Sequence, residues 1–511
     1  AQPYVDHART RRFLLNTLLA HSCWPLAGLR GTAPVARRAI GSCGTYAFSE
    51  WASSQRLWAS SLCALLMQMT LAQDSLNIRL LSVWDDPSLP GSALYDNTYN
   101  GSWGYHRDGR EYGIIGSTMG THIIDVTDPY QPEELHFIPG AVQGPNIVHR
   151  EYKTYLDRLY AVTDEGPGTL QIIDLSELPD SATVIYDSND LFFRAHTLWI
   201  DTVNARLYTH GGNTNFAIYS LADPDLPTEL LVPELDVPWW SASVGYVHDA
   251  YTRNNITYTN DVDGMHIVDF SNVNAPVLLG SLTNYPQPGY NHSGWLSDNG
   301  WLYAMCDETH NTRVKLFDVS DPNDIQFIDT IGPVTRINNI SHNPCFQGDL
   351  LHLAYYYDGY WLYDVSDPAN AQLLGYYDGS LIADGFSYKG VWGVYPYLPS
   401  GIVLGGDMQR GLMIFDISQA LAVRDGLAKP DGALHVWPNP AADEVRIAMD
   451  RSTSERLSVE VVDMQGRSVI RATLNNDQPL DIRILPVGTY VLKAMTKDRT
   501  MTARLMKTTA R

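Results

Sequence analysis

The sequence lacks the features that would place it in several large classes of protein. Its 511 residues contain no apolar run that could form a stable membrane span, because the best candidate, residues 56–72, is too short. Only five residues are cysteine, and three of them, Cys23, Cys43 and Cys63, precede residue 73. Positive charge is also scarce, with 35 Lys and Arg against 57 Asp and Glu. A chain of net charge −22 repels phosphate backbones, so no nucleic-acid partner is expected.

Common enzyme signatures are missing as well. The sequence has no P-loop, no dinucleotide-binding glycine fingerprint, no His-Glu-x-x-His, no Gly-x-Ser-x-Gly and no Cys-x-x-Cys. Asp261-Val-Asp263-Gly264 begins like a calcium loop but lacks the later ligands of an EF-hand. Any chemistry must therefore come from side chains that the fold brings together.

One short apolar motif recurs along the middle of the chain and predicts the fold. Its first copy is Ile123-Ile124-Asp125-Val126, and we call it the repeated phrase. Successive copies are 46–52 residues apart, which is typical of the blades of a β-propeller. A strand this apolar is covered on both faces, as it is between neighbouring blades. The polar residue that closes each copy is Asp125, Asp174, Ser220, Asp269, Asp318, Asp364 or Asp416. We predict an all-β chain, a seven-bladed β-propeller of four-stranded blades followed by a small C-terminal β-sandwich.

The two ends of the repeat region predict how the propeller closes. The third repeat divides into four strands, residues 196–201, 206–210, 216–221 and 228–232, separated by turn-forming residues. After the seventh phrase no fourth strand is evident. Residues 77–84 read as a fourth strand without the three before it, so we expect them to complete the seventh blade and remove an open sheet edge.

Composition divides the rest of the chain into segments. Residues 1–55 contain Arg but no Lys and show no sustained apolar period, so we interpret them as a non-native upstream or disordered segment; a genuine pro-segment is the alternative. Residues 56–72 have the basic start, apolar stretch and final Ala72 of a signal peptide. The propeller is expected over 73–418, a linker over 419–432 and the β-sandwich over 433–511.

The tail carries three motifs in a fixed order. They are Pro438-Asn439-Pro440-Ala441, then Val462-Asp463-Met464-Gln465-Gly466, then Pro486-Val487-Gly488-Thr489-Tyr490. The tail resembles the C-terminal sorting domain of the type IX secretion system of Bacteroidota. This resemblance implies recognition by the secretion machinery through Pro438, Asn439, Pro440, Asp463, Gly466, Gly488 and Tyr490. It further implies export across the outer membrane, followed by release or surface anchoring. An ordinary immunoglobulin-like module is the alternative.

The repeat region also has a family likeness. Its landmarks are Tyr290-Asn-His292, His310-Asn-Thr-Arg313, Ile340-Ser-His342-Asn343 and residues 393–401. With its repeated phrase, the region resembles LVIVD-repeat propellers of the choice-of-anchor B family. The resemblance implies a secreted repeat protein with an anchoring tail, and it implies no particular reaction.

Histidines recur at or near the start of the predicted first strands. They are His106, His149, His196, His248, His292 and His342. The first strand of a propeller blade is innermost, so these side chains, with Asp249, are expected at one mouth of the channel. The seventh repeat has Ser387-Tyr388 there instead. Two interpretations stay open, a hydrogen-bonded network in each blade or a ligand site formed by a subset.

A metal site is one form that such a subset can take. Imidazole and carboxylate together bind Zn, Mn or Fe, although a seven-bladed channel is too wide for six imidazoles to share one ion. The best metal candidates are His248, His292 and His342, with Asp261, Asp307 and His310 in sequence register. No cofactor is certain, and a divalent metal (Ca, Zn or Mn) is the candidate.

Two remaining features stay open between structural and functional interpretations. Cys306 and Cys345 fall in neighbouring blades, where export would permit a disulfide, or they are two buried thiols. Trp239-Trp240 and Tyr355-Tyr356-Tyr357 either pack between blades or stack on sugar rings.

The sequence as a whole predicts a secreted or outer-membrane surface protein, after cleavage of the signal peptide. The expected function is binding of an extracellular glycan, protein or peptide at one face of the channel. The alternative is a metal-dependent hydrolase or lyase with a His/Asp site at the channel mouth. No transmembrane segment is expected in the mature chain.

Overall fold

A computed structural model describes residues 74–333, 338–379, 387–426, 434–439, 441–449, 456–463, 467–475, 478–495 and 500–509. The expected upstream segment (1–55), the signal peptide (56–72), Pro440 and Gly466 lie outside the described residues, as does part of the expected linker. Among the helices that the structure does describe, none has both the length and the hydropathy needed to cross a membrane.

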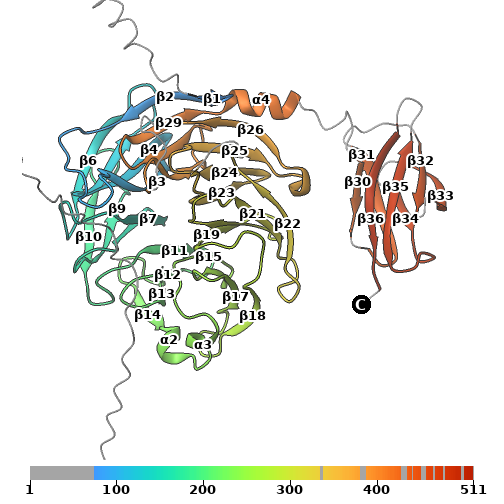
Figure 1. The fold of residues 1–511 in the computed structure, drawn as a ribbon, viewed down its shortest axis with the longest axis horizontal. Coiled ribbons are helices and arrows are strands. Elements are labelled where there is room, and N and C mark those ends of the chain that lie inside the picture. Colours follow the sequence, from blue (N-terminus) through green and yellow to red (C-terminus); the bar gives the residue numbers. More distant parts are fainter. Residues whose placement is uncertain are drawn as a thin grey trace, which may run out of the picture. The chain divides into compact units, whose positions relative to one another are not determined.

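Residues 75–416 form antiparallel sheets arranged around one axis (Figure 1). In chain order the first sheets are β3 (Tyr99–Arg107), β4 (Arg110–Ser117), β5 (Gly120–Asp125) and β6 (Glu133–Pro139); β7 (Arg150–Tyr155), β8 (Arg158–Thr163), β9 (Leu170–Asp174) and β10 (Thr183–Ser188); and β11 (Thr197–Asp201), β12 (Arg206–His210), β13 (Phe216–Ser220) and β14 (Thr228–Leu231).

The later sheets repeat this plan. They are β15 (Asp249–Arg253), β16 (Ile256–Asn260), β17 (Met265–Asp269) and β18 (Val277–Leu282); β19 (Asn291–Leu296), β20 (Leu302–Asp307), β21 (Val314–Asp318) and β22 (Gln326–Ile331); β23 (Asn343–Gln347), β24 (Leu350–Ala354), β25 (Tyr360–Asp364) and β26 (Gln372–Tyr377), extended by β1 (Ser75–Leu76); and β27 (Val391–Tyr395), β28 (Val403–Asp407) and β29 (Gly411–Asp416), completed by β2 (Arg79–Trp84).

The sheets close into a ring, as in a β-propeller. The innermost strands β3, β7, β11, β15, β19, β23 and β27 each lie against the next, and β27 returns against β3. Clusters of buried side chains fill the space between neighbouring sheets; one of them joins Tyr112 and Ile123 to Leu159 and Ile173. The expected closure is confirmed, because β2 pairs with β29 in a register that sets Leu80 opposite Phe415.

The repeated phrase forms the third strand of each sheet. Strands β5, β9, β13, β17, β21, β25 and β29 all end at its closing polar residue. That residue then caps the turn that follows, since Asp125 Oδ1 accepts a hydrogen bond from the amide of Thr127 at 2.8 Å. Asp318 and Asp416 make the same bond to the residue two positions on, both at 2.9 Å. The phrase recurs because each blade needs an apolar strand and a capped turn.

Helical segments are short and lie between or after the sheets. α2 (Pro233–Asp236) and α3 (Trp240–Ser243) link β14 to β15, and η1 (Pro368–Asn370) precedes β26. Trp240 is fully buried against Phe216 and Phe270, so this aromatic residue is inter-blade packing. The segment predicted to be a linker begins as a helix, which the sequence analysis did not predict. Residues 418–426 form α4 (Ser418–Gly426), whose Ala420 joins the core between the last two sheets.

The C-terminal residues form two further sheets around their own core. One contains β30 (Leu434–Trp437), β31 (Glu444–Met449) and β34 (Gln478–Asp481), and the other β33 (Ser468–Leu474), β32 (Leu457–Val462), β35 (Gly488–Met495) and β36 (Thr500–Lys507). The two sheets share one cluster of buried side chains, including Val445, Val459 and Leu492. The structure therefore has the small β-sandwich that the alternating sequence predicts.

Residues of all three tail motifs make defined contacts in this sandwich. The Asn439 side chain accepts a hydrogen bond from the amide of Met506 and donates one to the carbonyl of Arg504. Asp463 binds the Arg467 guanidinium at 2.7 Å. Tyr490 donates to the carbonyl of Pro486, while Pro438 is exposed and Gly488 begins β35.

Cys306 in β20 and Cys345 in β23 are both buried free thiols in the structure. They therefore form no disulfide here. Burial raises the pKa of each thiol to about 12, which keeps both protonated and unreactive.

Candidate functional site

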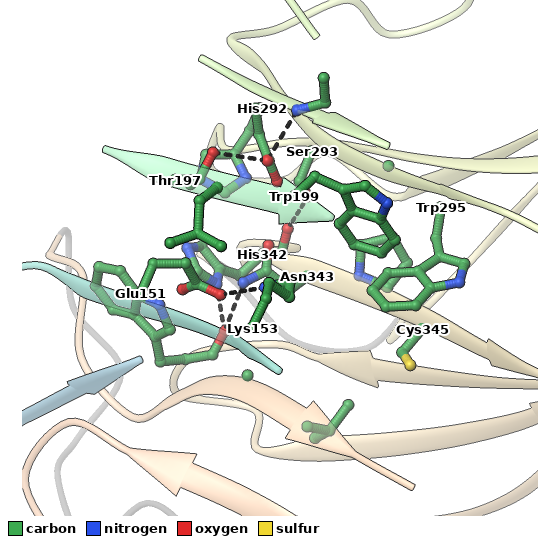
Figure 2. Close-up of a pocket in the computed structure, with 18 of the residues that line it drawn as sticks. Glu151, Lys153, Thr197, Trp199, His292, Ser293, Trp295, His342, Asn343 and Cys345 are labelled. Carbon is green, nitrogen blue, oxygen red and sulfur yellow. Dashed lines mark hydrogen bonds and ion pairs between the residues drawn. The ribbon is translucent and has the colours of Figure 1, made fainter. Parts of the chain in front are cut away.

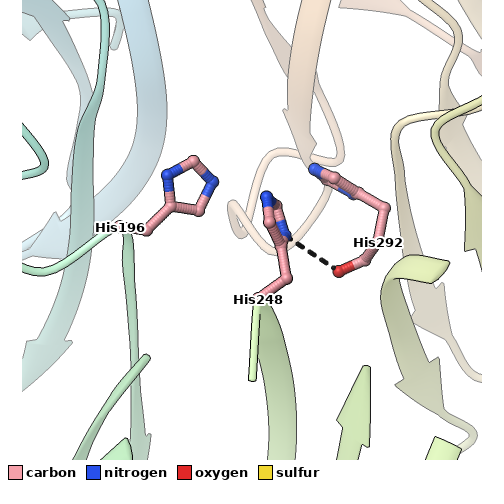
Figure 3. A group of neighbouring side chains, drawn as sticks. All are labelled: His196, His248 and His292. Atoms are coloured by element: carbon pink, nitrogen blue, oxygen red, sulfur yellow. Dashed lines mark hydrogen bonds between the residues drawn. The ribbon is translucent and has the colours of Figure 1, made fainter. Parts of the chain in front are cut away.

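Aromatic side chains stand at the start of the innermost strands and face one another around the axis. They are His149, His196, His248, His292, His342 and Trp392, which we call the histidine circle. From His149 round to Trp392, neighbouring ring centroids are 4.9, 4.2, 4.4, 4.5 and 4.8 Å apart, and 5.2 Å closes the circle back to His149. Figure 3 shows three of these imidazoles side by side.

Strand register explains which residues enter the circle. His149, His196, His248 and His342 each come directly before the residue that pairs with the end of the second strand. In the β19 sheet Asn291 pairs with that end, and a β-bulge places His292 between Asn291 and Ser293. Beside His149, the Arg150 guanidinium donates to the carbonyls of Ser117 and Val142.

His106 is not part of the circle, contrary to the sequence-based expectation. It lies near the outer end of β3, opposite Glu111, and is exposed. Nearer the axis this sheet has Gly101, where a Cβ atom would lie 2.1 Å from the carbonyl oxygen of Arg150. No side chain fits there, so the β3 sheet contributes no ring to the circle.

Backbone carbonyls fix the protonation of two circle histidines. His248 Nδ1 donates to the carbonyl oxygen of His292 at 3.2 Å, and His342 Nδ1 donates to that of Trp392 (Figure 3 shows the first bond). The proton therefore resides on Nδ1, and Nε2 keeps its lone pair. Burial lowers the pKa of His342 to about 3 and that of His248 and His292 well below the usual value. These three imidazoles are neutral at physiological pH.

On the side of the circle away from His342, two histidines are hydrogen-bonded to carboxylates. His196 Nδ1 lies 3.0 Å from Asp164 Oδ2, and His149 Nδ1 is hydrogen-bonded to Glu165. Burial alone would lower the pKa of His196, but the bond to Asp164 raises it above the usual value. The same bond lowers the pKa of Asp164 against the effect of its own burial. The carboxylates come from the turn after β8.

One carboxyl group lies beside the neutral imidazoles. The Glu308 side chain is 16% exposed, and its oxygens lie 3.9 Å from His292 Nε2 and 3.8 Å from His342 Nε2. Its hydrogen-bond donor is the Tyr356 hydroxyl, which binds Oε1 at 2.5 Å. Burial raises the pKa of Glu308 to about 7, so the group changes charge near neutral pH.

Above the circle lies a cavity of about 350 Å³ that opens to solvent. Its floor contains all six members of the circle, and its wall contains Tyr95, Tyr290, Tyr356, Tyr388, Thr309, His310 and Glu308. The tyrosines pack edge to face, with Tyr388 5.6 Å from Tyr95 and 5.7 Å from Tyr356. Burial raises the pKa of Tyr95 and Tyr388, which keeps their hydroxyls protonated as hydrogen-bond donors.

Below the circle the channel narrows to a polar chamber of about 70 Å³ (Figure 2). Lys153 pairs with Glu151 at 2.6 Å and lies 4.3 Å from the centre of the Trp103 ring. Asp249 Oδ1 accepts a hydrogen bond from the Thr197 hydroxyl at 2.8 Å. His196, His292 and His342 line both this chamber and the cavity above, so the circle separates the two spaces.

Aromatic residues surround the chamber, and Trp103, Trp199 and Trp295 are part of its lining. Trp199 lies 4.6 Å from Tyr251 and 4.8 Å from Trp295, and Trp103 lies 4.9 Å from Tyr395. These residues belong to β3, β11, β15, β19 and β27, five of the seven inner strands. The cavity above the circle is therefore a cup with a packed floor.

The structure brings together only part of the predicted metal set. His248, His292 and His342 are adjacent, but Asp261 is bound to His266 at 2.8 Å in the turn after β16. Asp307 is fully buried against the Lys315 ammonium at 2.6 Å and also accepts a hydrogen bond from Tyr285. His310 lines the cup, and its Nδ1 donates to the Asn338 carbonyl at 3.0 Å, in the segment after β22.

Sequence reasoning missed the residues that complete the cup. Glu308 directly follows Asp307, the last residue of β20, and the sequence does not show which of the two carboxylates faces the axis. The circle histidines stand 21–26 residues before the closing polar residue of their own repeat. In the last repeat this range covers residues 390–395, which include both Trp392 and Tyr395. The same range leaves out His106, which is 19 residues before Asp125.

Within the described residues, three groups of side chains have ligand atoms close enough to share a metal ion. They are His196, His248 and His292; His149, Asp164 and His196; and His292, Glu308 and His342. In each group the ligand atoms lie within 4.8 Å of one another. Any of them would face the cup, since all except Asp164 line it.

Comparison with known proteins identifies the tail. Residues 435–508 match the family described as secretion system C-terminal sorting domain. This confirms that part of the predicted resemblance and implies export to the cell surface or the medium. No curated protein is significantly similar to the chain in sequence.

Several solved structures align with the chain, one of them a β-propeller domain. A protein from Lactobacillus plantarum aligns with 10% identity and a TM-score of 0.43, over 70% of this chain and 92% of its own. The Cps50 (Swd1) β-propeller domain of Myceliophteria thermophila aligns with 10% identity and a TM-score of 0.44, over 66% and 98%. The computationally designed Ika8 protein aligns with 10% identity and a TM-score of 0.40, over 63% and 98%.

Proposed function

We propose that this chain is an exported, seven-bladed β-propeller that binds the end of a glycan in the cup above the histidine circle. The proposed mature protein runs from residue 73, with the propeller over 73–418 and the sorting domain over 433–511. Its export is supported by the match of the tail to a secretion sorting domain. The proposal also keeps the protein in the LVIVD-repeat, choice-of-anchor B group, a secreted or surface-attached product of Bacteroidota.

The lining of the cup is the observation that carries this function. A volume of about 350 Å³ lies at the lower end of the range for small-molecule sites, and the packed floor gives the cup a defined depth. Tyrosine and tryptophan rings offer apolar faces, while their hydroxyl and imidazole neighbours offer hydrogen bonds. A sugar ring presents the same combination, with apolar C–H faces and hydroxyls at its edge.

The charge of the cup narrows the choice of ligand. Glu308 and the carboxylates beside His149 and His196 disfavour a strongly anionic chain end. A neutral oligosaccharide therefore fits the cup better than a polyanion. A protein or peptide would enter only with a narrow, polar tip, because the floor is closed by aromatic packing.

Two wall tyrosines provide the test. Tyr290→Ala and Tyr388→Ala each remove a half-buried ring from the cup, and we expect each to weaken binding about tenfold, since loss of one stacking contact is worth roughly 1–2 kcal/mol. Binding is measured by titration calorimetry with a panel of neutral and uronic-acid oligosaccharides. Tyr130→Ala, 58% exposed and outside the cup, is the matched control.

The proposal fails if no oligosaccharide binds, or if both wall variants bind as tightly as the wild type. Binding of a peptide panel in place of every oligosaccharide would also overturn it, because the ligand class would then be wrong.

A further inference from the structure

We propose that His292, His342 and Glu308 form a binding site for one divalent transition-metal ion, such as Zn²⁺, in the floor of the cup. The three side chains come from β19, the residue before β23, and the turn after β20. Two imidazoles and one carboxylate are a ligand set found in catalytic zinc sites, where a fourth position stays open. The site does not depend on which organic ligand the cup takes.

The protonation of His342 is the strongest argument. Because His342 Nδ1 donates its proton to the Trp392 carbonyl, Nε2 carries a lone pair and no proton. This lone pair faces Glu308 Oε1 across 3.8 Å, a separation too long for a hydrogen bond. Two electron-rich atoms thus face each other in a buried place, and among the described residues no Lys or Arg pairs with Glu308. A cation held between them would satisfy both.

The spacing agrees with such an ion. Glu308 Oε2 lies 3.9 Å from His292 Nε2, close to the 3.8 Å on the other side. Ligand atoms that share a tetrahedral Zn²⁺ at about 2.0–2.1 Å are about 3.3 Å apart. All three ligand atoms lie within 4.8 Å of one another, so rotations of the three side chains would bring them onto one ion.

The surrounding residues orient the ligands. The Trp392 carbonyl fixes the His342 ring, and the Tyr356 hydroxyl holds Glu308 Oε1. Metal-binding histidines and carboxylates characteristically have such partners. All three proposed ligands line the cup, so the open coordination position would face the space where a ligand enters.

The competing groups are less suited to the ion. In the group of His149, Asp164 and His196, the carboxylate is already hydrogen-bonded to His196 at 3.0 Å, and a proton occupies the place of a cation. The group of His196, His248 and His292 has no carboxylate to offset the charge of a divalent ion. It remains the alternative that the experiment must distinguish.

The test uses the purified full chain, stripped of metal with a chelator and titrated with Zn²⁺ and Co²⁺. We expect one ion per chain, with the visible absorption bands of four- or five-coordinate Co²⁺. Glu308→Gln keeps the shape and the Tyr356 contact but removes the charge, and we expect it to weaken binding by at least about tenfold. His342→Asn should do the same, and Tyr356→Phe should weaken binding about tenfold through loss of the contact to Glu308.

His196→Asn, from the opposite side of the circle, distinguishes the candidate groups, and we expect it to weaken metal binding much less than Glu308→Gln does. Each variant is first compared with the wild type by circular dichroism, and Tyr356→Phe, which deletes only one hydroxyl, gives a reading if a ligand variant fails to fold. The proposal is overturned if no stoichiometric ion binds. It is equally overturned if His196→Asn abolishes binding while Glu308→Gln retains it, because the ion would then lie among the three imidazoles.

Discussion

Buried histidines outside the circle show at the scale of one residue how burial controls charge. His352 lies in β24, fully buried, with its ring stacked on Tyr360 and Nδ1 2.7 Å from the Tyr360 hydroxyl. Burial lowers the pKa of His352 to about 3 from a usual value of 6.5. The folded protein therefore holds this imidazole neutral at pH values where the unfolded chain takes up a proton.

This difference makes stability depend on pH. The contribution of neutral His352 is fully present above pH 6.5 and is lost as the pH falls below it, at about 1.4 kcal/mol per pH unit. We expect His352→Phe to reduce the pH slope of the free energy of unfolding by about that amount between about pH 6.5 and 5.5. Urea unfolding at several pH values measures the slope. His106→Phe, at an exposed position, is the control, and equal slopes for wild type and His352→Phe would contradict the prediction.

At the scale of elements, the β2 strand connects the two ends of the propeller. It is the outermost strand of the last sheet, and Trp84 and Leu80 pack in the cores on either side of that sheet. Without β2, the β29 strand would present an unpaired edge, which natural sheets avoid. The neighbouring pair of Arg79 with Asp416 is largely exposed and contributes little by comparison.

Removal of this strand should therefore destabilise the whole propeller. We expect a chain that begins at residue 87 to lose more than about 4 kcal/mol of stability, or to aggregate, because it loses a paired strand and its buried side chains together. A chain that begins at residue 74 keeps β2 and is the matched control. Thermal unfolding and size-exclusion chromatography compare the two. Equal melting temperatures would show that pairing of β2 with β29 does not stabilise the propeller.

At the scale of the whole molecule, two parts of opposite charge serve different purposes. Residues 73–432 are strongly acidic, whereas the tail from residue 433 carries 12 Lys and Arg against 9 Asp and Glu. The tail has its own hydrophobic core and matches a sorting domain. The export signal therefore lies in a different part of the chain from the cup.

Deletion of residues 434–511 tests this separation. We expect the truncated protein to stay in the periplasm while the full chain reaches the cell surface or the medium, because the sorting signal lies in the deleted sandwich. Cell fractionation and immunoblotting measure the distribution. The propeller should keep its thermal transition in the truncated form, and export without the tail would refute the assignment of the signal.

Much of the fold follows from the sequence, because its determinants are local and repeated. The apolar phrase and its closing Asp mark the third strand of every sheet, and the lone strand at residues 77–84 predicts the closure with β29. Helix α4 was missed since its amphipathic pattern is weak. The phrase itself is structural, as expected from its position away from the axis.

The site was less predictable, because it depends on the direction of single side chains. Five of the six predicted histidines meet around the axis, but a β-bulge in β27 brings Trp392 into the circle in place of the predicted Ser387-Tyr388 position. Asp307 and Glu308 both carry a carboxyl group and are adjacent in the sequence. Only the pairing of Asp307 with the buried Lys315 ammonium determines that Glu308 is left to face the cup.

The closure by β2 also has a consequence for the order of events during export. Arg79 and Asp416, which meet at this closure, are 337 residues apart in the chain. A contact between such distant segments forms late, since most of the chain must be ordered before the two segments meet. The β2 strand therefore stays unpaired until the β29 strand of the last blade is present. The ring of sheets can close only after the whole propeller has been exported. A partly exported chain keeps an unpaired strand edge, which proteases can recognise.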